Sequence, residues 1–114
     1  MVRNSAVETF KVRNAMGSKL SPPDEELYRR TDEVLHYIWD PIGVSGAPTA
    51  RDEYYSYLPQ VFSLLRNNAA AEAIAAYLFQ VATEHMGLAG NKEHAIQVAE
   101  VLLDWKETIL QKNV

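Results

Sequence analysis

Three histidines lie beside or near carboxylates, and these residue types are the first that could do chemistry together. Two of them directly follow a glutamate, in the pairs Glu84-His85 and Glu93-His94, and the third is His36. A metal site needs three or four ligands that converge on one point. Neighbouring residues on a helix diverge by about 100°, so neither pair can chelate an ion as an H-E-x-x-H motif does. The sequence therefore predicts no metal site and no cofactor.

Motifs for nucleophilic or phosphate chemistry are missing as well. The chain has no cysteine, which excludes thiolate catalysis, disulfides and cysteine-ligated metal sites. It has no glycine-rich phosphate loop and no G-x-S-x-G elbow. We therefore expect no catalytic residues and a protein that is not an enzyme. The alternative that stays open is a small metal-dependent hydrolase that uses His36, His85 or His94 with nearby carboxylates.

The most distinctive feature is a Trp-Asp-Pro sequence at residues 39–41, here called the W-D-P turn. The proline stops a helix, Asp40 can accept backbone N–H groups in an Asx-turn, and Trp39 can bury a large ring. This structural interpretation accounts for each residue. The functional hypothesis instead places these residues on a recognition surface with others nearby. The candidate binding residues are Trp39, Asp40, Asp52, Glu53 and Tyr55.

Three tyrosines lie close together in the chain, at positions 54, 55 and 57. Helical spacing places Tyr54 on one face with Leu58 and Val61, which predicts a core position with its hydroxyl at a polar edge. Tyr55 points elsewhere on the same helix, and we expect it to be exposed.

Charge is unevenly distributed along the chain. Residues 1–20 hold four basic and one acidic side chain, a balance of +3, whereas residues 21–114 hold seven basic and fourteen acidic ones, a balance of −7. This argues against nucleic-acid binding, which needs clustered Lys and Arg. A concentrated negative patch would attract basic proteins. We expect five carboxylates to gather near the W-D-P turn: Asp32, Glu33, Asp40, Asp52 and Glu53.

The spacing of apolar residues predicts the helices that position these side chains. A first helix over residues 23–38 carries an apolar stripe at Leu27, Thr31, Val34, Leu35 and Ile38. Similar patterns predict a helix that follows Thr49, one over residues 70–86 and one over residues 92–111. No segment shows the alternation of a strand. The predicted fold is all-α, a compact bundle of four main helices in one domain at residues 21–114. A basic segment or short helix precedes it at residues 1–20.

Local signals refine the predicted ends of these helices. Thr49 is predicted to cap the second helix, and Pro59 inside that helix predicts a kink or break, which leaves the carbonyl of Tyr55 to water or a side chain. Gly87 is predicted to end the third helix in a left-handed conformation, and Asn91 to cap the last one.

Several short motifs together resemble a known family. They are Trp39-Asp40-Pro41-Ile42-Gly43-Val44, residues 52–54 with Tyr57, residues 84–88 and residues 102–106. In these motifs the chain is similar to a group of small bacterial proteins of unknown function, whose first helix runs into a W-D-P-hydrophobic-G turn. The resemblance covers roughly residues 28–107 and implies a small helical fold. It supplies no catalytic residues, and it favours a binding role because small bacterial proteins of this kind include toxin-neutralising immunity proteins.

These observations predict a non-enzymatic bacterial domain that binds another protein through an acidic surface. A toxin-immunity or inhibitor protein, with a basic toxin as its partner, is one specific version of this hypothesis. No apolar run approaches the roughly 18–20 residues of a membrane helix, and no signal-peptide pattern opens the chain. We therefore expect a cytoplasmic protein that has no membrane and no nucleic-acid partner.

Overall fold

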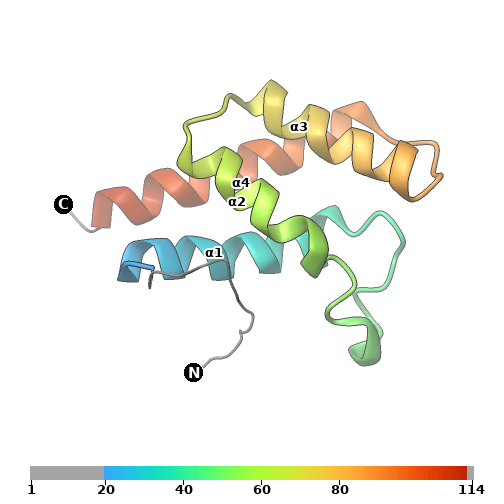
Figure 1. Cartoon of the computed structure of the whole chain (residues 1–114), viewed down its shortest axis with the longest axis horizontal. Coiled ribbons are helices and arrows are strands. Elements are labelled where there is room, and N and C mark those ends of the chain that lie inside the picture. Colours follow the sequence, from blue (N-terminus) through green and yellow to red (C-terminus); the bar gives the residue numbers. More distant parts are fainter. Residues whose placement is uncertain (1–19, 113–114) are drawn as a thin grey trace.

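A computed structural model describes residues 20–112 and shows a bundle of helices (Figure 1). Its four α-helices are α1 (Pro22–Val34), α2 (Leu58–Arg66), α3 (Ala71–Gln80) and α4 (Lys92–Lys112). The described residues contain no strand. The prediction of an all-α bundle is therefore confirmed. The basic segment predicted at residues 1–20 lies, apart from Leu20, outside the described residues.

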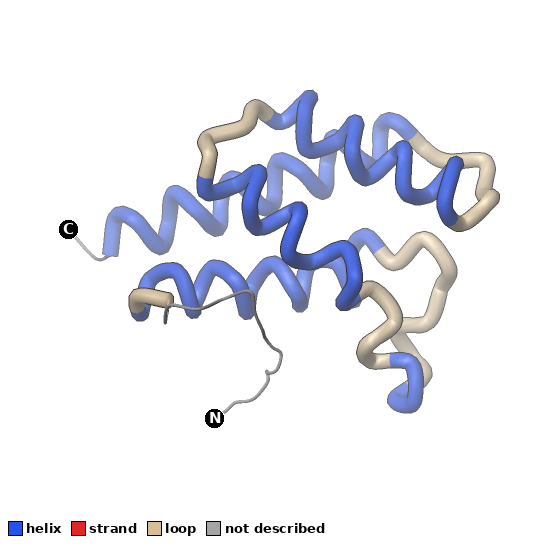
Figure 2. Tube along the Cα trace, viewed as in Figure 1, coloured by secondary structure: helices blue, strands red, loops and turns tan. Residues whose placement is uncertain are grey.

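The long helix α4 is the centre of the bundle. It packs against both α1 and α3, while α2 crosses in front of them (Figure 1). Two connections lie at the same end of the bundle: the long one between α1 and α2, and the short one between α3 and α4 (Figure 2). No helix within residues 20–112 is long and apolar enough to cross a membrane. The W-D-P turn belongs to the first of these connections, so this end of the bundle holds most of the residues singled out above.

Helix α1 begins as predicted but ends differently. The Ser21 hydroxyl accepts the N–H of Asp24 at 3.3 Å and caps its start. A π-helical turn, Leu35–Trp39, follows α1 directly. This wider turn shifts the buried face by one residue, so Trp39 is 4% exposed and Ile38 is 44% exposed. The prediction that Ile38 belongs to the buried stripe is therefore wrong.

The second helix starts later than predicted. Thr49 lies inside a short 3-10 helix, Pro48–Ala50, without a side-chain cap, and a second one, Tyr55–Tyr57, precedes α2. Pro59 stands in the first turn of α2, where its missing N–H has no helical partner to lose. The predicted break is confirmed, and the predicted cap at Thr49 is wrong. The Tyr55 carbonyl is also not left to water or a side chain, because it accepts the N–H of Leu58.

The junction between α3 and α4 follows the prediction closely. Helix α3 ends in a second π-helical turn, Val81–His85, and Gly87 then adopts the left-handed φ of +70°. The Asn91 side chain accepts the N–H of His94 at 2.9 Å and so caps α4. Near its other end, α4 buries Ile109, whereas Leu110 is 57% exposed.

Candidate functional site

Asp40 organises the W-D-P turn from its own side chain. It has a left-handed backbone, with φ of +34°, which aspartate tolerates better than most residues. Its carboxylate accepts three backbone N–H groups, from Gly43 at 3.1 Å, Val44 at 2.8 Å and Ser45 at 3.1 Å. The predicted Asx-type role of Asp40 is confirmed.

Tyr54 stabilises this turn through two hydrogen bonds of its hydroxyl group. Its hydroxyl donates to the Asp40 carboxylate at 2.7 Å and accepts the N–H of Ile42 at 3.1 Å. Burial and the hydrogen bond to Asp40 both raise the pKa of Tyr54. Burial alone would raise the pKa of Asp40, but the Tyr54 hydroxyl and the N–H groups of the turn outweigh it and lower that pKa.

Trp39 lies beneath this network in the core. Its ring packs against Tyr54 at a centroid distance of 5.3 Å and against Tyr57 at 6.3 Å. The structural interpretation of the W-D-P turn is therefore confirmed, because Trp39 is buried and the Asp40 carboxylate already accepts hydrogen bonds from the turn and from Tyr54. Recognition of a protein partner by these two residues would require the turn to open.

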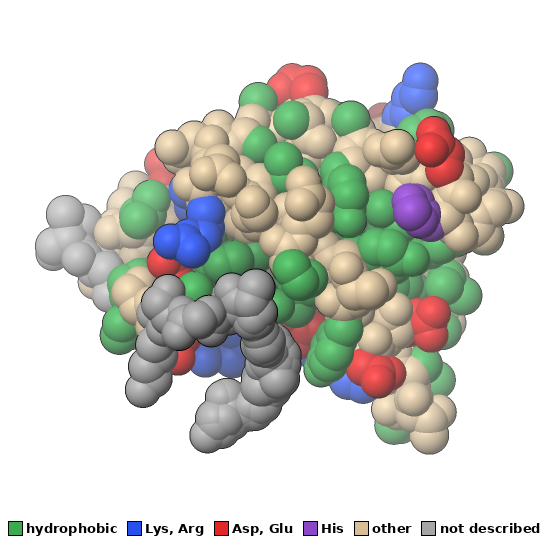
Figure 3. All heavy atoms as spheres, in the orientation of Figure 1, with side chains coloured by type: hydrophobic (Ala, Val, Ile, Leu, Met, Phe, Trp, Pro, Cys, Tyr) green, Lys and Arg blue, Asp and Glu red, His purple; other side chains and the backbone are tan. Residues whose placement is uncertain are grey.

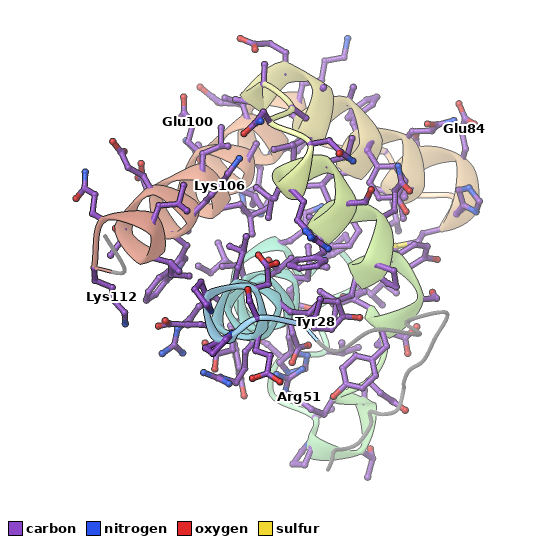
Figure 4. All side chains as sticks on the ribbon, turned by 60° about the vertical axis from the view of Figure 1, so that its left-hand side comes forward. Tyr28, Arg51, Glu84, Glu100, Lys106 and Lys112 are labelled. Atoms are coloured by element: carbon purple, nitrogen blue, oxygen red, sulfur yellow. The ribbon has the colours of Figure 1, made fainter. Side chains whose placement is uncertain are left out.

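An outward-facing cluster stands next to the turn, and we call it the Arg51 surface. The Arg51 guanidinium makes a two-pronged ion pair with Asp32, at 3.0 and 2.9 Å, and lies 5.4 Å from the ring centre of Tyr37. Figure 4 shows Arg51 on the outer side of α1, away from α4. The exposed fractions are 59% for Tyr37 and 49% for Tyr55. The Arg51 surface consists of Tyr37, Arg51, Asp52, Glu53 and Tyr55.

Electrostatics tie Tyr55 to this cluster. Partial burial and the charge of Asp32 raise the pKa of Tyr55, although Arg51 opposes them. Burial would lower the pKa of Arg51, but the hydrogen bond and charge of Asp32 outweigh it and raise that pKa. Tyr55 therefore presents a neutral hydroxyl at neutral pH, beside a fixed cation.

The predicted acidic patch is smaller than the sequence suggests. Asp32 forms an ion pair with Arg51, and Glu33 forms one with Arg30 at 2.8 Å. The Asp40 carboxylate accepts hydrogen bonds from backbone N–H groups of its own turn. Asp52 and Glu53 are exposed, and their carboxylates have no hydrogen bond or ion pair within residues 20–112. Acidic side chains are scattered over the face drawn in Figure 3. Two of the five predicted carboxylates thus remain to meet a partner.

The histidines occupy three different environments. His36 is 3% exposed, and its buried Nδ1 has no hydrogen-bond partner among residues 20–112, whereas His85 is exposed beside the ring of Tyr57. The Nε2 of His94 lies 3.0 Å from the carbonyl oxygen of Ile38 and 3.3 Å from that of Trp39. Among the described residues, no three His, Cys, Asp or Glu side chains are grouped so as to hold a metal ion. The hydrolase alternative gains no support from this geometry.

Comparisons of the chain with protein families, with curated proteins and with solved structures find no match. The resemblance to the W-D-P turn family thus stays a prediction. Sequence reasoning named Asp52, Glu53 and Tyr55 but missed Tyr37 and Arg51. Tyr37 left a weak signal, as a large aromatic residue off the apolar stripe. Arg51 left none, because its pairing with Asp32 joins residues 19 positions apart.

Proposed function

We propose that this protein is a non-enzymatic, cytoplasmic binding domain that engages a basic protein partner through the Arg51 surface. The observation that carries the proposal is the arrangement of two half-exposed tyrosines, Tyr37 and Tyr55, around the Arg51–Asp32 ion pair. A bacterial immunity or inhibitor protein that neutralises a basic toxin is the specific version we favour.

The residue types of this surface support a binding role. Tyrosine and arginine are enriched among the residues that contribute most to protein–protein affinity. A tyrosine buries a large area on binding, and it loses little conformational entropy because its side chain has few rotatable bonds. Most exposed aromatic side chains need no special explanation when they occur singly. Two of them beside one arginine form a compact set of contacts that an interface can cover completely.

The arginine is also held in place before any partner arrives. Both of its terminal nitrogens are bonded to Asp32, and the Tyr37 ring flanks the guanidinium. A fixed side chain loses less conformational entropy when it enters an interface. The W-D-P turn contributes indirectly, because it fixes the connection that carries residues 51–55.

The two unpaired carboxylates suggest the charge of the partner. Asp52 and Glu53 are exposed beside Arg51, whose own charge is balanced by Asp32. The surface therefore has a net negative charge, on a body whose balance over residues 21–114 is −7. Such a field mainly raises the rate of association with a basic protein.

Association kinetics with the partner test this proposal. The partner is first obtained by affinity capture from the native organism and identified by mass spectrometry. We expect its association rate constant to fall about tenfold or more between low salt and about 0.15 M, where the Debye length is about 8 Å. The double variant Asp52→Lys/Glu53→Lys should associate more slowly still, with its thermal unfolding unchanged.

A matched control separates local from overall charge. Glu100 and Asp104 are exposed on α4, and Figure 4 shows Glu100 far from Arg51. The double variant Glu100→Lys/Asp104→Lys changes the net charge by the same amount, and it should associate nearly as fast as the wild type. Equal slowing by both double variants, or rates that ignore salt and charge reversal alike, would contradict binding at the Arg51 surface.

A further inference from the structure

A hollow of about 450 Å³ lies at the end of the bundle, between the W-D-P turn and the connection of α3 to α4. Small-molecule sites usually have volumes of about 300–1,000 Å³ and mostly apolar walls. The lining includes aromatic rings from Trp39 and Phe79 and aliphatic side chains from Leu78 and Leu88, and its surface is divided almost equally between apolar and polar atoms. This hollow is separate from the Arg51 surface, none of whose residues line it.

The backbone around the hollow is unusual in two ways. Its lining includes one residue from each π-helical turn, Trp39 from the first and Ala82 from the second. Single π-helical turns are rare and frequently occur at functional sites. Gly90 lines the hollow with φ of +81°, and a Cβ added there would lie 2.6 Å from the Phe79 ring. The loop backbone at Gly90 therefore packs closely against the Phe79 ring, which forms one wall of the hollow.

Two polar side chains in the lining have unused hydrogen-bonding atoms. Carbonyl oxygens can only accept, so the His94 Nε2 that contacts those of Ile38 and Trp39 carries a hydrogen. In the neutral ring, Nδ1 is then an acceptor, and no described residue donates to it. The Asn91 side-chain oxygen accepts the N–H of His94, while its NH₂ group has no partner among residues 20–112. An acceptor and a donor on neighbouring side chains complement a hydroxyl group.

We propose that the hollow binds a small phenolic molecule. The aromatic ring packs between Trp39, Phe79 and Leu88. The hydroxyl donates to Nδ1 of His94 and accepts from the amide NH₂ of Asn91. The hydrogen bonds from Nε2 of His94 to the carbonyls of Ile38 and Trp39 orient the imidazole and leave Nδ1 as the acceptor for the ligand.

Two probes that differ by one hydroxyl group test this proposal: p-cresol and toluene. Each is titrated into the full-length protein, and binding is followed by NMR through amide shifts and the indole N–H signal of Trp39. We expect p-cresol to bind saturably, with a dissociation constant on the order of 1 mM, as suits a molecule of this size. Shifts should centre on Trp39 and residues 78–95. Toluene lacks both hydrogen bonds of the hydroxyl group, each worth about fivefold in affinity, so it should bind roughly 25-fold more weakly.

Matched variants locate the site. Leu88 lines the hollow and is 37% exposed, whereas Leu110 is 57% exposed and does not line it. Leu88→Ala should weaken p-cresol binding several-fold, and Leu110→Ala should leave it unchanged; both side chains are at the surface, so both variants should fold. The variant His94→Phe should reduce the preference for p-cresol over toluene to about fivefold, because the amide NH₂ of Asn91 still donates to the hydroxyl group. Shifts that do not saturate, or equal effects of the two leucine variants, would overturn the site. Equal affinity for the two probes would overturn the assignment of the hydroxyl.

Discussion

Replacing Trp39 with alanine should lower the free energy of unfolding by about 3–5 kcal/mol, as truncation of a large buried aromatic residue does. The ring is 4% exposed and packs against Tyr54 and Tyr57, so its removal leaves a cavity under the turn. A domain of this size has only about 5–15 kcal/mol of stability in total. The variant should therefore unfold at a much lower urea concentration.

The other tryptophan provides a matched control for this experiment. Trp105 is half-buried on α4, with the guanidinium of Arg30 at 4.9 Å from its ring. Trp105→Ala makes the same change in side-chain size, but it should cost clearly less because part of that ring is already in water. A urea midpoint for Trp39→Ala equal to that of the wild type would mean that Trp39 is exposed, and it would return Trp39 to the list of binding residues.

Replacing Asp40 with alanine should cost about 2–3 kcal/mol, because hydrogen bonds to a charged acceptor are worth more than neutral ones. The carboxylate accepts three backbone N–H groups and the Tyr54 hydroxyl, and alanine satisfies none of them. Alanine also tolerates the left-handed φ of +34° less well than aspartate. Tyr54→Phe removes only the hydroxyl, so it should cost less than Asp40→Ala. Chemical denaturation of the three proteins at pH 7 measures these differences.

The same residue gives the protein a pH dependence of known sign. The pKa of Asp40 is lower in the folded protein than its ordinary value of 3.8. The unfolded chain therefore binds more protons between the two values. The stability that Asp40 contributes is complete above its unfolded pKa and is lost as the pH falls through its folded pKa. As the pH falls from about 4 through the folded pKa of Asp40, the difference in stability between wild type and Asp40→Ala should shrink, because protonation removes the charge of Asp40. A difference that stays constant from pH 7 down to pH 2 would show that the charge of Asp40 is irrelevant.

The regular helices could be predicted from the sequence because their signals are local. The cap at Asn91 and the left-handed Gly87 each depend on residues within one helical turn. The π-helical turns could not be predicted, because the helices are assigned from apolar residues spaced for an α-helix. A π-helical turn has more residues per turn and so changes which residues share a face. That change moved Ile38 to the surface and placed Trp39 in the core.

The candidate sites depend on contacts between distant segments, which the sequence pattern does not contain. The sequence places five carboxylates near the W-D-P turn. It does not reveal that two of them are paired with arginines, Asp32 with Arg51 and Glu33 with Arg30. The hollow depends on the meeting of the first π-helical turn with the start of α4, where His94 contacts residues more than 50 positions away. Tertiary packing, and not local preference, produces both features.

Hydrogen–deuterium exchange of the protein alone and in complex with its captured partner tests the central claim most directly. If the Arg51 surface is the binding site, the partner should slow amide exchange in residues 50–57 and around Tyr37. The outer face of α4 around Glu100 should exchange at the same rate in both samples. Protection confined to α4, or to the loop at residues 86–91, with residues 50–57 unchanged, would contradict the account and place the binding surface elsewhere.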